Sequence, residues 1–274
     1  MDGIHKAGIT ISTYREFRPP PALAEHLFCF WIQTVDASSA IRQRVLPDCC
    51  VDIVLVNGVP MVIGPWTKAF ETDLPPGTNI LGARCHPGLA SSLLGVPASE
   101  LLNLSIPLRD LWGGGKTAAY LRIADQTAVA AQISAMERAL LESVAAAIPI
   151  DNEIREGVRW IARHPCARID RLGQLLGLSS RQIQRRFAAA VGYGPKLFQS
   201  VFRFQRLLNE AHEAGGRRGL ADLASDAGYS DQSHMTREFQ RFADCLPSSL
   251  LQSASSTLIM SDLFKTGESG SEYS

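Results

Sequence analysis

The sequence as a whole has no excess charge of either sign, because Lys and Arg together number 27 and Asp and Glu also number 27. This balance excludes a strongly basic coat protein and a strongly acidic tail protein. No apolar run approaches the ~18 residues that a membrane helix needs, and residues 1–10 lack the apolar core of a signal peptide. The sequence therefore predicts a cytoplasmic protein with no membrane partner.

The motifs of common metal and nucleotide enzymes are also missing. The six cysteines form no CxxC pair, and the N-terminal half has no HxH pair of the kind that a metal-dependent cupin enzyme would need. The stretch GGGKT, residues 113–117, resembles the end of a P-loop, but Asp110 stands where GxxxxGK[ST] requires its first glycine. We therefore expect no catalytic site, no metal and no cofactor, and interpret GGGKT as a loop entering a helix.

What is present is typical of a folded protein of two domains. Of 274 residues, 46% are apolar and 20% are charged, which argues against disorder. Residues 1–115 contain short apolar runs broken by Pro, Gly and Asn, and Asn57 with Gly58 between two such runs predicts a tight β-hairpin. Short helical pieces are expected at 90–94 and 97–104. The N-terminal part is therefore predicted to be a small sandwich or barrel.

From Lys116 onward the pattern becomes helical. Apolar residues recur at helical spacing through Ala147, which predicts one or two amphipathic helices acting as a linker or dimerisation segment over residues 116–150. Asp151 can cap the next helix, and residues 151–255 are interpreted as successive short helices. The whole chain is thus an α+β protein, with a Ser-rich and flexible tail expected at 256–274.

The net charge is unevenly distributed along the chain. Residues 151–255 hold fifteen basic and eleven acidic side chains, and fourteen of the fifteen basic ones are Arg. Arg can form bidentate hydrogen bonds with phosphate and guanine. The uneven charge therefore favours a nucleic-acid partner for the C-terminal part.

The clearest signal is an internal repeat of a helix–turn–helix pattern. In the first copy, residues 169–190, Leu172, Leu175 and Leu176 are expected to form the inner face of a helix, Gly177 the turn and Ser179 the cap of a second helix. In the second copy, residues 220–242, Gly228 is expected to form the turn and Ser230 the cap. A helix over 195–211 is predicted between the copies. The repetition of turn, cap and core positions favours this interpretation over two unrelated helical hairpins.

At these residues the sequence resembles the AraC/XylS family of bacterial transcription regulators. The stretches that carry the resemblance are LGLSSRQIQRRFAAAVGYGPKLFQSVFRFQRLL and LADLASDAGYSDQSHMTREFQRF. The N-terminal half resembles the sensor domain of one subgroup, through LPDCCVDIVL, IGPWT, LGARCHPG, LLGVPASEL and LRDLWG. The resemblance implies a regulator with a β-rich sensor domain at 1–115 and a double helix–turn–helix domain at 151–255.

In such a domain each second helix enters the major groove of double-stranded DNA, with the two sites one turn apart. Outward positions at the start of each of these helices are the candidates for base contact, and Arg and Gln suit guanine and adenine. The candidates in the first unit are Ser179, Ser180, Arg181, Gln184 and Arg185, and those in the second are Gln232, Ser233, His234 and Arg237. Arg186, Lys196 and Arg203 are candidate phosphate contacts.

For the sensor domain the sequence leaves three alternatives open. The favoured one is a pocket for a small-molecule effector, with candidate residues Trp31, Asp48, Cys50, Asp52, Trp66, Arg84 and His86. The second is a soft-metal or thiol-redox sensor built from Cys49, Cys50 and Cys85, although buried packing cysteines are the simpler interpretation. The third is a ligand-free protein–protein adaptor domain.

A different class of protein, an enzyme with an accessory DNA-binding domain, is disfavoured because residues 1–110 show no acid–base or metal constellation. RNA polymerase and a second copy of the chain are further partners that the family resemblance suggests.

Overall fold

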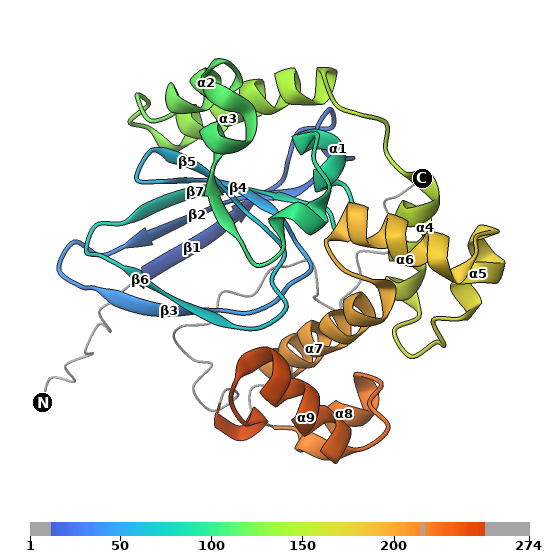
Figure 1. Ribbon diagram of the computed structural model, residues 1–274. Coiled ribbons are helices and arrows are strands. Elements are labelled where there is room, and N and C mark those ends of the chain that lie inside the picture. Colours follow the sequence, from blue (N-terminus) through green and yellow to red (C-terminus); the bar gives the residue numbers. More distant parts are fainter. Residues whose placement is uncertain (1–11, 215–216, 250–274) are drawn as a thin grey trace, which may run out of the picture.

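The computed structural model describes residues 12–214 and 217–249. It confirms the predicted order of a β-rich N-terminal part followed by helices (Figure 1). The larger sheet has six antiparallel strands, in the spatial order β1 (Ser12–Phe17), β2 (Leu27–Val35), β7 (Asn79–Cys85), β4 (Asp52–Val56), β5 (Val59–Ile63) and β8 (Ser105–Pro107). A second sheet pairs β3 (Ile41–Val45) with β6 (Phe70–Leu74). The two sheets form the predicted sandwich-like body. The tail expected at 256–274 lies outside the described residues.

The strands follow from local sequence signals and from side-chain alternation. Asn57 and Gly58 both have positive φ, 48° and 82°, and join β4 to β5, which confirms the predicted hairpin. Successive residues of β4 face opposite sides of the sheet. Ile53 and Leu55 pack into one core cluster, and Val54 packs into another. The larger sheet is therefore buried on both faces.

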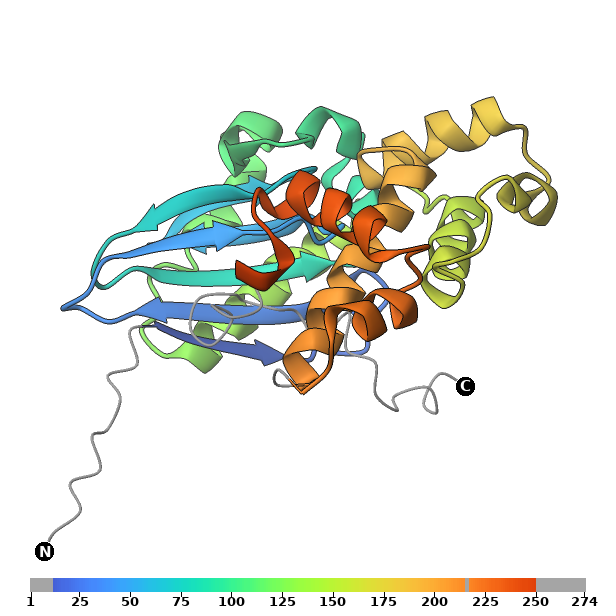
Figure 2. The ribbon, with the colours of Figure 1, turned by 90° about the horizontal axis from the view of Figure 1, so that it is seen from below.

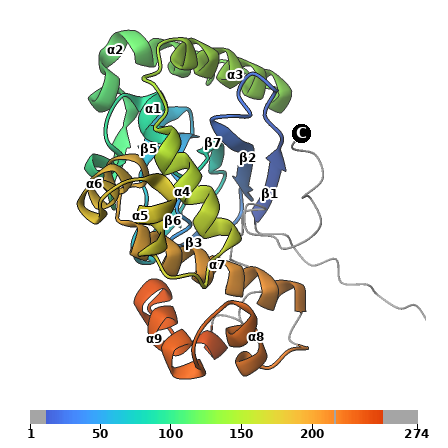
Figure 3. The same cartoon turned by 90° about the vertical axis from the view of Figure 1, so that its right-hand side faces the viewer.

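Helices cover the face of the larger sheet that is turned away from the small sheet (Figures 1 and 3). They are α1 (Ala90–Leu94), the 3-10 turn η1 (Ala98–Leu101), α2 (Leu108–Leu121) and α3 (Val129–Ala145). Tyr120, Met136 and Leu140 pack in the same core as Ile53 and Leu55. The segment expected to be a linker is therefore part of the N-terminal core, and α2 begins eight residues before Lys116.

The stretch that resembles a P-loop end is helical rather than a loop. Gly113 lies inside α2, where φ 70° and ψ 178° interrupt the helix and produce a kink. Only glycine enters this backbone conformation without steric strain. This segment thus resembles a phosphate-binding loop in sequence but not in structure.

The C-terminal part contains α4 (Asn152–Arg163), α5 (Arg171–Leu176), α6 (Ser180–Val191), α7 (Pro195–Ala214), α8 (Leu220–Asp226) and α9 (Gln232–Ala243). The long helix α7 lies between the pairs α5/α6 and α8/α9 (Figures 1 and 3). Its Phe198 contacts Phe187 of α6, and its Phe204 contacts Phe239 and Phe242 of α9. The helix α7 therefore packs against both helix pairs through aromatic side chains.

Helix ends match the sequence in most places. Asp151 and Ser179 cap α4 and α6 as expected, and Gly177 and Gly228 have the positive φ that their turns require. Two expectations were wrong. Asp231, rather than Ser230, caps α9 through the backbone N–H of His234, because the second turn is one residue longer. Leu172 is buried, but Leu175 is exposed and does not belong to the inner face of α5. The helix has only six residues, and Leu172 is its buried residue.

The two halves of the chain are packed against each other. Cys49 lies in the core cluster of the C-terminal helices, and Gln205 of α7 donates a hydrogen bond to the carbonyl of Pro47. Arg155 of α4 pairs with Glu25. Among the described residues no helix is long and apolar enough to cross a membrane.

Candidate ligand pocket and nucleic-acid interface

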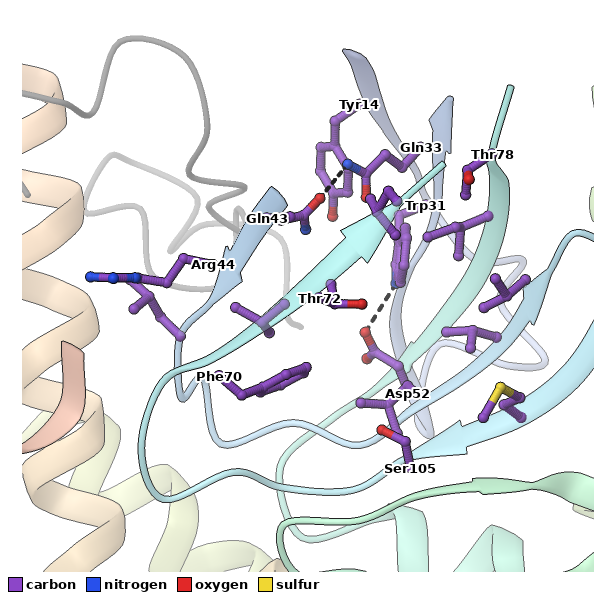
Figure 4. A pocket seen from close by; sticks show the side chains of 18 of the residues that line it. Tyr14, Trp31, Gln33, Gln43, Arg44, Asp52, Phe70, Thr72, Thr78 and Ser105 are labelled. Carbon is purple, nitrogen blue, oxygen red and sulfur yellow. Dashed lines mark hydrogen bonds between the residues drawn. The ribbon is translucent and has the colours of Figure 1, made fainter. Parts of the chain in front are cut away.

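A cavity of about 350 Å³ lies between the two sheets, and its lining residues come from both (Figure 4). This volume falls within the range of pockets that bind small molecules. Apolar side chains form much of the wall, among them Val54, Val56, Met61, Ile63, Leu74 and Ile80. Polar side chains are gathered at a few places in it, which is the composition expected of a site that orients a ligand.

Strand alternation places the polar groups. Trp31 and Gln33 on β2, Asp52 on β4 and Arg84 on β7 all lie on the sheet face that lines the cavity. Asp52 and Arg84 are direct partners in the register of β4 and β7. Gly82 of β7 lies between Trp31 on β2 and the strand β4 that carries Asp52. A Cβ added at Gly82 would lie 2.1 Å from the indole of Trp31. A glycine is needed there because the indole crosses β7 to reach Asp52.

Arg84 is at the centre of a buried ionic cluster. Its Nε and Nη2 donate to the two carboxylate oxygens of Asp52 at 3.1 and 2.9 Å. Its Nη2 also lies 3.5 Å from Asp48, and its Nη1 lies 4.0 Å from Glu16. Burial alone would lower the pKa of Arg84, but the carboxylates of Asp52 and Asp48 outweigh this and hold it well above its usual value. The guanidinium therefore stays charged inside the protein.

A second polar contact joins the two sheets at the opposite side of the cavity. Gln33 of β2 donates to Gln43 of β3 at 2.6 Å, and both amides are buried (Figure 4). Thr72 of β6 and Thr78 also line the cavity. These neutral groups offer hydrogen bonds without adding charge.

The cavity reaches the helical half of the chain. Gln205 and Leu208 of α7 are part of its lining, although α7 is the helix that holds the two helix–turn–helix pairs together. Strands β5 and β6 contribute Ile63 and Phe70, and the segment 64–69 joins them. Within that segment Trp66 stacks on Phe70 with ring centroids 3.9 Å apart. A molecule in the cavity would thus lie against groups that contact the helices directly.

Segment 64–69 also contacts both pairs of helices. Pro65 lies against Gly192 at the end of α6, where an added Cβ would approach Pro65 Cγ to 2.4 Å. The backbone N–H of Ala69 donates to the carbonyl of Phe242 in α9 at 2.7 Å. Seen from below, α9 lies in front of the strands (Figure 2). A single short segment therefore connects the cavity wall with both pairs.

Of the seven residues expected in a ligand site, four line the cavity and three do not. Trp31, Asp48, Asp52 and Arg84 are in its wall. Cys50 is buried beside Asp48, Trp66 stacks on Phe70, and His86 packs edge-on against Phe28. Residues that the sequence analysis missed include Tyr14, Gln33, Gln43, Thr72, Phe70 and Gln205. Alternate residues of a strand face the same side of the sheet, so the placement of Trp31 in the wall predicts that Gln33 also lies there. Gln205 is 153 positions beyond Asp52, and no local sequence pattern indicates its place in the cavity wall.

The three cysteines of the thiol-sensor alternative are dispersed and shielded. Cys49 lies in the core of the C-terminal helices, and Cys85 lies in the core under α1–α3. Burial raises the pKa of all three thiols, so each stays in its unreactive protonated form at neutral pH. In the described part of the chain no group of three or more His, Cys, Asp and Glu side chains could hold a metal ion.

The first helix–turn–helix pair presents part of the expected set to solvent. Ser179, Ser180, Arg181, Gln184 and Arg185 are exposed at the start of α6. Arg186 is on the flank of the helix, where it pairs with Asp151 and Glu153 at the start of α4. These ion pairs raise the pKa of Arg186 and tie α6 to α4.

The second pair has the same layout. Gln232, Ser233 and Arg237 are exposed on α9, and His234 is partly covered by Tyr229. The two remaining candidates differ from each other. Lys196 is exposed at the start of α7, whereas Arg203 lies between Glu238 at 3.4 Å and the ring of Tyr229. The structure thus brings Arg203 together with α9 inside the domain.

Two family descriptions match the chain. The family described as "Domain of unknown function (DUF6597)" matches residues 15–107, which include most of both sheets and most of the residues that line the cavity. The family described as "Helix-turn-helix domain" matches residues 172–253, which comprise α5–α9. The chain therefore carries a C-terminal domain of the helix–turn–helix class, a class of DNA-binding domains. Its C-terminal domain is of the AraC type, as the sequence resemblance predicted.

Several solved structures resemble the chain at low sequence identity. Apo ToxT from Vibrio cholerae strain SCE256, in a variant form, has 11% identity, covers 81% of this chain and 97% of its own, and has a TM-score of 0.45. Wild-type ToxT from the same strain with a bound unsaturated fatty acid has 10% identity, covers 78% and 94%, and has a TM-score of 0.40. At TM-scores below 0.5 these matches do not define the architecture of this chain. No curated protein is significantly similar to it in sequence.

Proposed function

We propose that this protein is a transcription regulator that binds double-stranded DNA through two helix–turn–helix units and binds a small-molecule effector in the cavity between its sheets. The observation that supports the effector role most directly is the placement of Gln205 and Leu208 of α7 in the cavity wall. Because α7 carries both units, a ligand that prefers one position of α7 changes the geometry of both. Regulation of transcription, rather than catalysis, is the role that this arrangement fits.

The proposed division of the chain follows the sequence boundaries with one change. Residues 12–107 hold the effector, α2 and α3 cover their sheet, and residues 151–255 bind DNA. The first boundary moves from 115 to 107 because α2 begins at Leu108. The cytoplasm as the location, pairing of two copies through residues 116–150, and contact with RNA polymerase also belong to the proposal, and they rest on the family resemblance.

The proposed DNA contacts are the exposed groups at the starts of α6 and α9. Arg181, Gln184 and Arg185 would contact bases in one major groove, and Gln232, Ser233 and Arg237 would contact bases in the next. Ser179, Ser180, His234 and Lys196 would contact the phosphate backbone. Arg186 and Arg203 would instead position the helices, because each is held by carboxylates of its own domain.

The effector would act through strands β5 and β6 and through α7. A ligand against Phe70 presses on Trp66, and segment 64–69 contacts the ends of α6 and α9. The fatty acid of the ToxT structure does not indicate the ligand of this chain, since the two share only 10% identity.

Selection of duplexes from a random pool by the full chain tests the DNA-binding part. An enriched sequence with two half-sites about one turn apart is expected, and log K for it should fall with log salt with a slope near −0.9 per neutralised phosphate. Recovery of no shared sequence, or an affinity that does not change with salt, would contradict the proposal.

A further inference from the structure

We infer that the ligand of the cavity is a small organic cation, with a positively charged nitrogen next to an apolar or aromatic body. This inference rests on the proposed function, because it names the effector class of the same site. It follows from the charges around the cavity, from the hydrogen bonds already made there, and from the side chains that form the wall.

The charges in the inner part of the cavity do not balance. Three carboxylates, those of Glu16, Asp48 and Asp52, surround the single guanidinium of Arg84. The side chains of Glu16 and Asp52 are each 11% exposed, so water compensates them poorly. Asp48 is more open, at 26%, and faces the cavity. A buried group with surplus negative charge is stabilised by a cation and destabilised by an anion.

The donors of Arg84 are directed mainly at carboxylates of the chain itself. Its Nε and Nη2 are bound to Asp52, its Nη2 also faces Asp48, and its Nη1 faces Glu16. Each guanidinium nitrogen is therefore already opposite a carboxylate of the chain. A ligand carboxylate or phosphate that approached Nη1 would lie close to the carboxylate of Glu16, which repels it.

The other cation at the cavity, Arg44, is turned away from it. It donates to Glu71 at 3.0 Å and to the carbonyl of Ala243 at 3.2 Å (Figure 4). It therefore links β3 to β6 and to the end of α9. Within the described lining, both Arg44 and Arg84 are paired with carboxylates of the chain.

The walls suit the remaining part of an organic cation. Tyr14 and Trp31 lie with ring centroids 5.8 Å apart, and both rings line the cavity. Phe70 lines the opposite side. Aromatic faces attract cations, and the aliphatic wall formed by Val54, Met61 and Ile80 would contact an apolar body. Asp48 is the group best placed to pair with the charged nitrogen, because it is the most open of the three carboxylates.

Three probes of the same size and shape test the charge preference directly. They are 3-phenylpropionamidinium, 3-phenylpropionamide and 3-phenylpropionate, which are cationic, neutral and anionic. Each would be titrated into the full chain by calorimetry and ligand-observed NMR. We expect the cation to bind about tenfold or more tightly than the amide, and the carboxylate to bind least.

Two variants assign the binding to the cavity and to Asp48. Asp48→Asn keeps an oxygen that can accept from the backbone N–H of Cys50, so the local turn is retained. It should reduce the advantage of the cation over the amide severalfold. The matched control Asp110→Asn removes the same charge at an exposed position of α2 and should leave all three affinities unchanged. Thr72→Trp fills the cavity and should weaken all three probes.

The outcomes separate this inference from the proposed function. Equal or tighter binding of the carboxylate, sensitive to Thr72→Trp, would overturn the cationic class and leave the pocket as an effector site. Binding of the cation that is unaffected by both Asp48→Asn and Thr72→Trp would place it elsewhere on the chain and overturn the inference. Binding of none of the three probes would count against both proposals. Unfolding temperature and DNA affinity of each variant show whether it is folded.

Discussion

The indole nitrogen of Trp31 donates a 3.1 Å hydrogen bond to Oδ2 of Asp52, although β7 lies between the strands that carry them. The bond crosses β7 at Gly82, the partner of both Trp31 and Val54 in the sheet register. One missing side chain thus allows an aromatic wall and an ionic cluster to form a single unit.

Gly82→Ala should separate that unit. Its new Cβ would lie 2.1 Å from the indole, so the ring must move and the bond to Asp52 is lost. We expect a loss of about 1–3 kcal/mol in the free energy of unfolding, measured by urea titration with tryptophan fluorescence. Gly114→Ala, with no atom within 4 Å of its added Cβ, is the control and should not destabilise the protein. Equal effects of the two substitutions would contradict this account.

Gly192→Ala should loosen the contact between the two halves of the chain. Gly192 has φ +101°, and an added Cβ would meet Pro65 at 2.4 Å. Gly177→Ala is a matched control, because its φ is +64° but no atom lies within 4 Å. Both variants should lose stability through backbone strain. Only Gly192→Ala should increase hydrogen exchange in segment 64–69, and similar exchange in both would show that strain alone is responsible.

Arg185 and Arg186 are adjacent and should behave differently. Exposed Arg185→Ala is expected to cost ~1–3 kcal/mol on the selected DNA sequence and to relax preference at one base pair. Arg186→Ala removes the ion pairs with Asp151 and Glu153, so it should lower the unfolding temperature and weaken binding to all sequences alike. The affinities of both protein variants for a panel of single-base variants of the site, together with their unfolding temperatures, test these expectations. If Arg185→Ala weakened every sequence equally, Arg185 would be a phosphate contact.

Stability should decrease between pH 7 and pH 5 through His26 and His86. Burial lowers the pKa of both side chains below the usual value of 6.5. As the pH is lowered through about 6.5, the unfolded chain takes up protons while the native protein does not. The free energy of unfolding therefore decreases as the pH decreases. Urea titrations across this range should give a smaller pH slope for His86→Gln than for the parent protein.

The cysteines should divide by accessibility. Cys166 is exposed, whereas burial raises the pKa of Cys49, Cys50 and Cys85 and keeps them protonated. A thiol reagent followed by mass spectrometry should modify Cys166 within minutes in the native protein and the other three only on unfolding. Fast modification of Cys85 together with loss of DNA binding would revive the thiol-sensor alternative.

Local features of this fold could be predicted from sequence because their causes are local. The hairpin at Asn57 and Gly58 depends on two neighbouring φ angles, and the cap at Ser179 depends on Ser179 and Gln182, which are three positions apart. The same local reasoning misplaced the cap of α9 by one residue, since either Ser230 or Asp231 can serve chemically.

The pocket could be predicted only in part. Trp31, Asp52 and Arg84 were identified from residue type, and the sheet register then brings Trp31 and Arg84 to Asp52 across 21 and 32 positions of sequence. Trp66 was expected in the wall, but Phe70 occupies the wall and Trp66 stacks behind it. The contribution of Gln205 depends on how the two halves of the chain pack, and no spacing along the chain encodes that.

The segment 64–69 contacts α6 through Pro65 and α9 through Ala69, only four residues apart. In the proposed DNA complex, α6 and α9 would enter major grooves about one turn of DNA apart, ~34 Å. A shift of the segment would then change the rotation of one helix relative to the other more than the fit of either helix to its own half-site. An effector would then act on operator spacing. Duplexes whose half-sites are moved apart or together by one base pair should change their order of affinity when the cavity is filled.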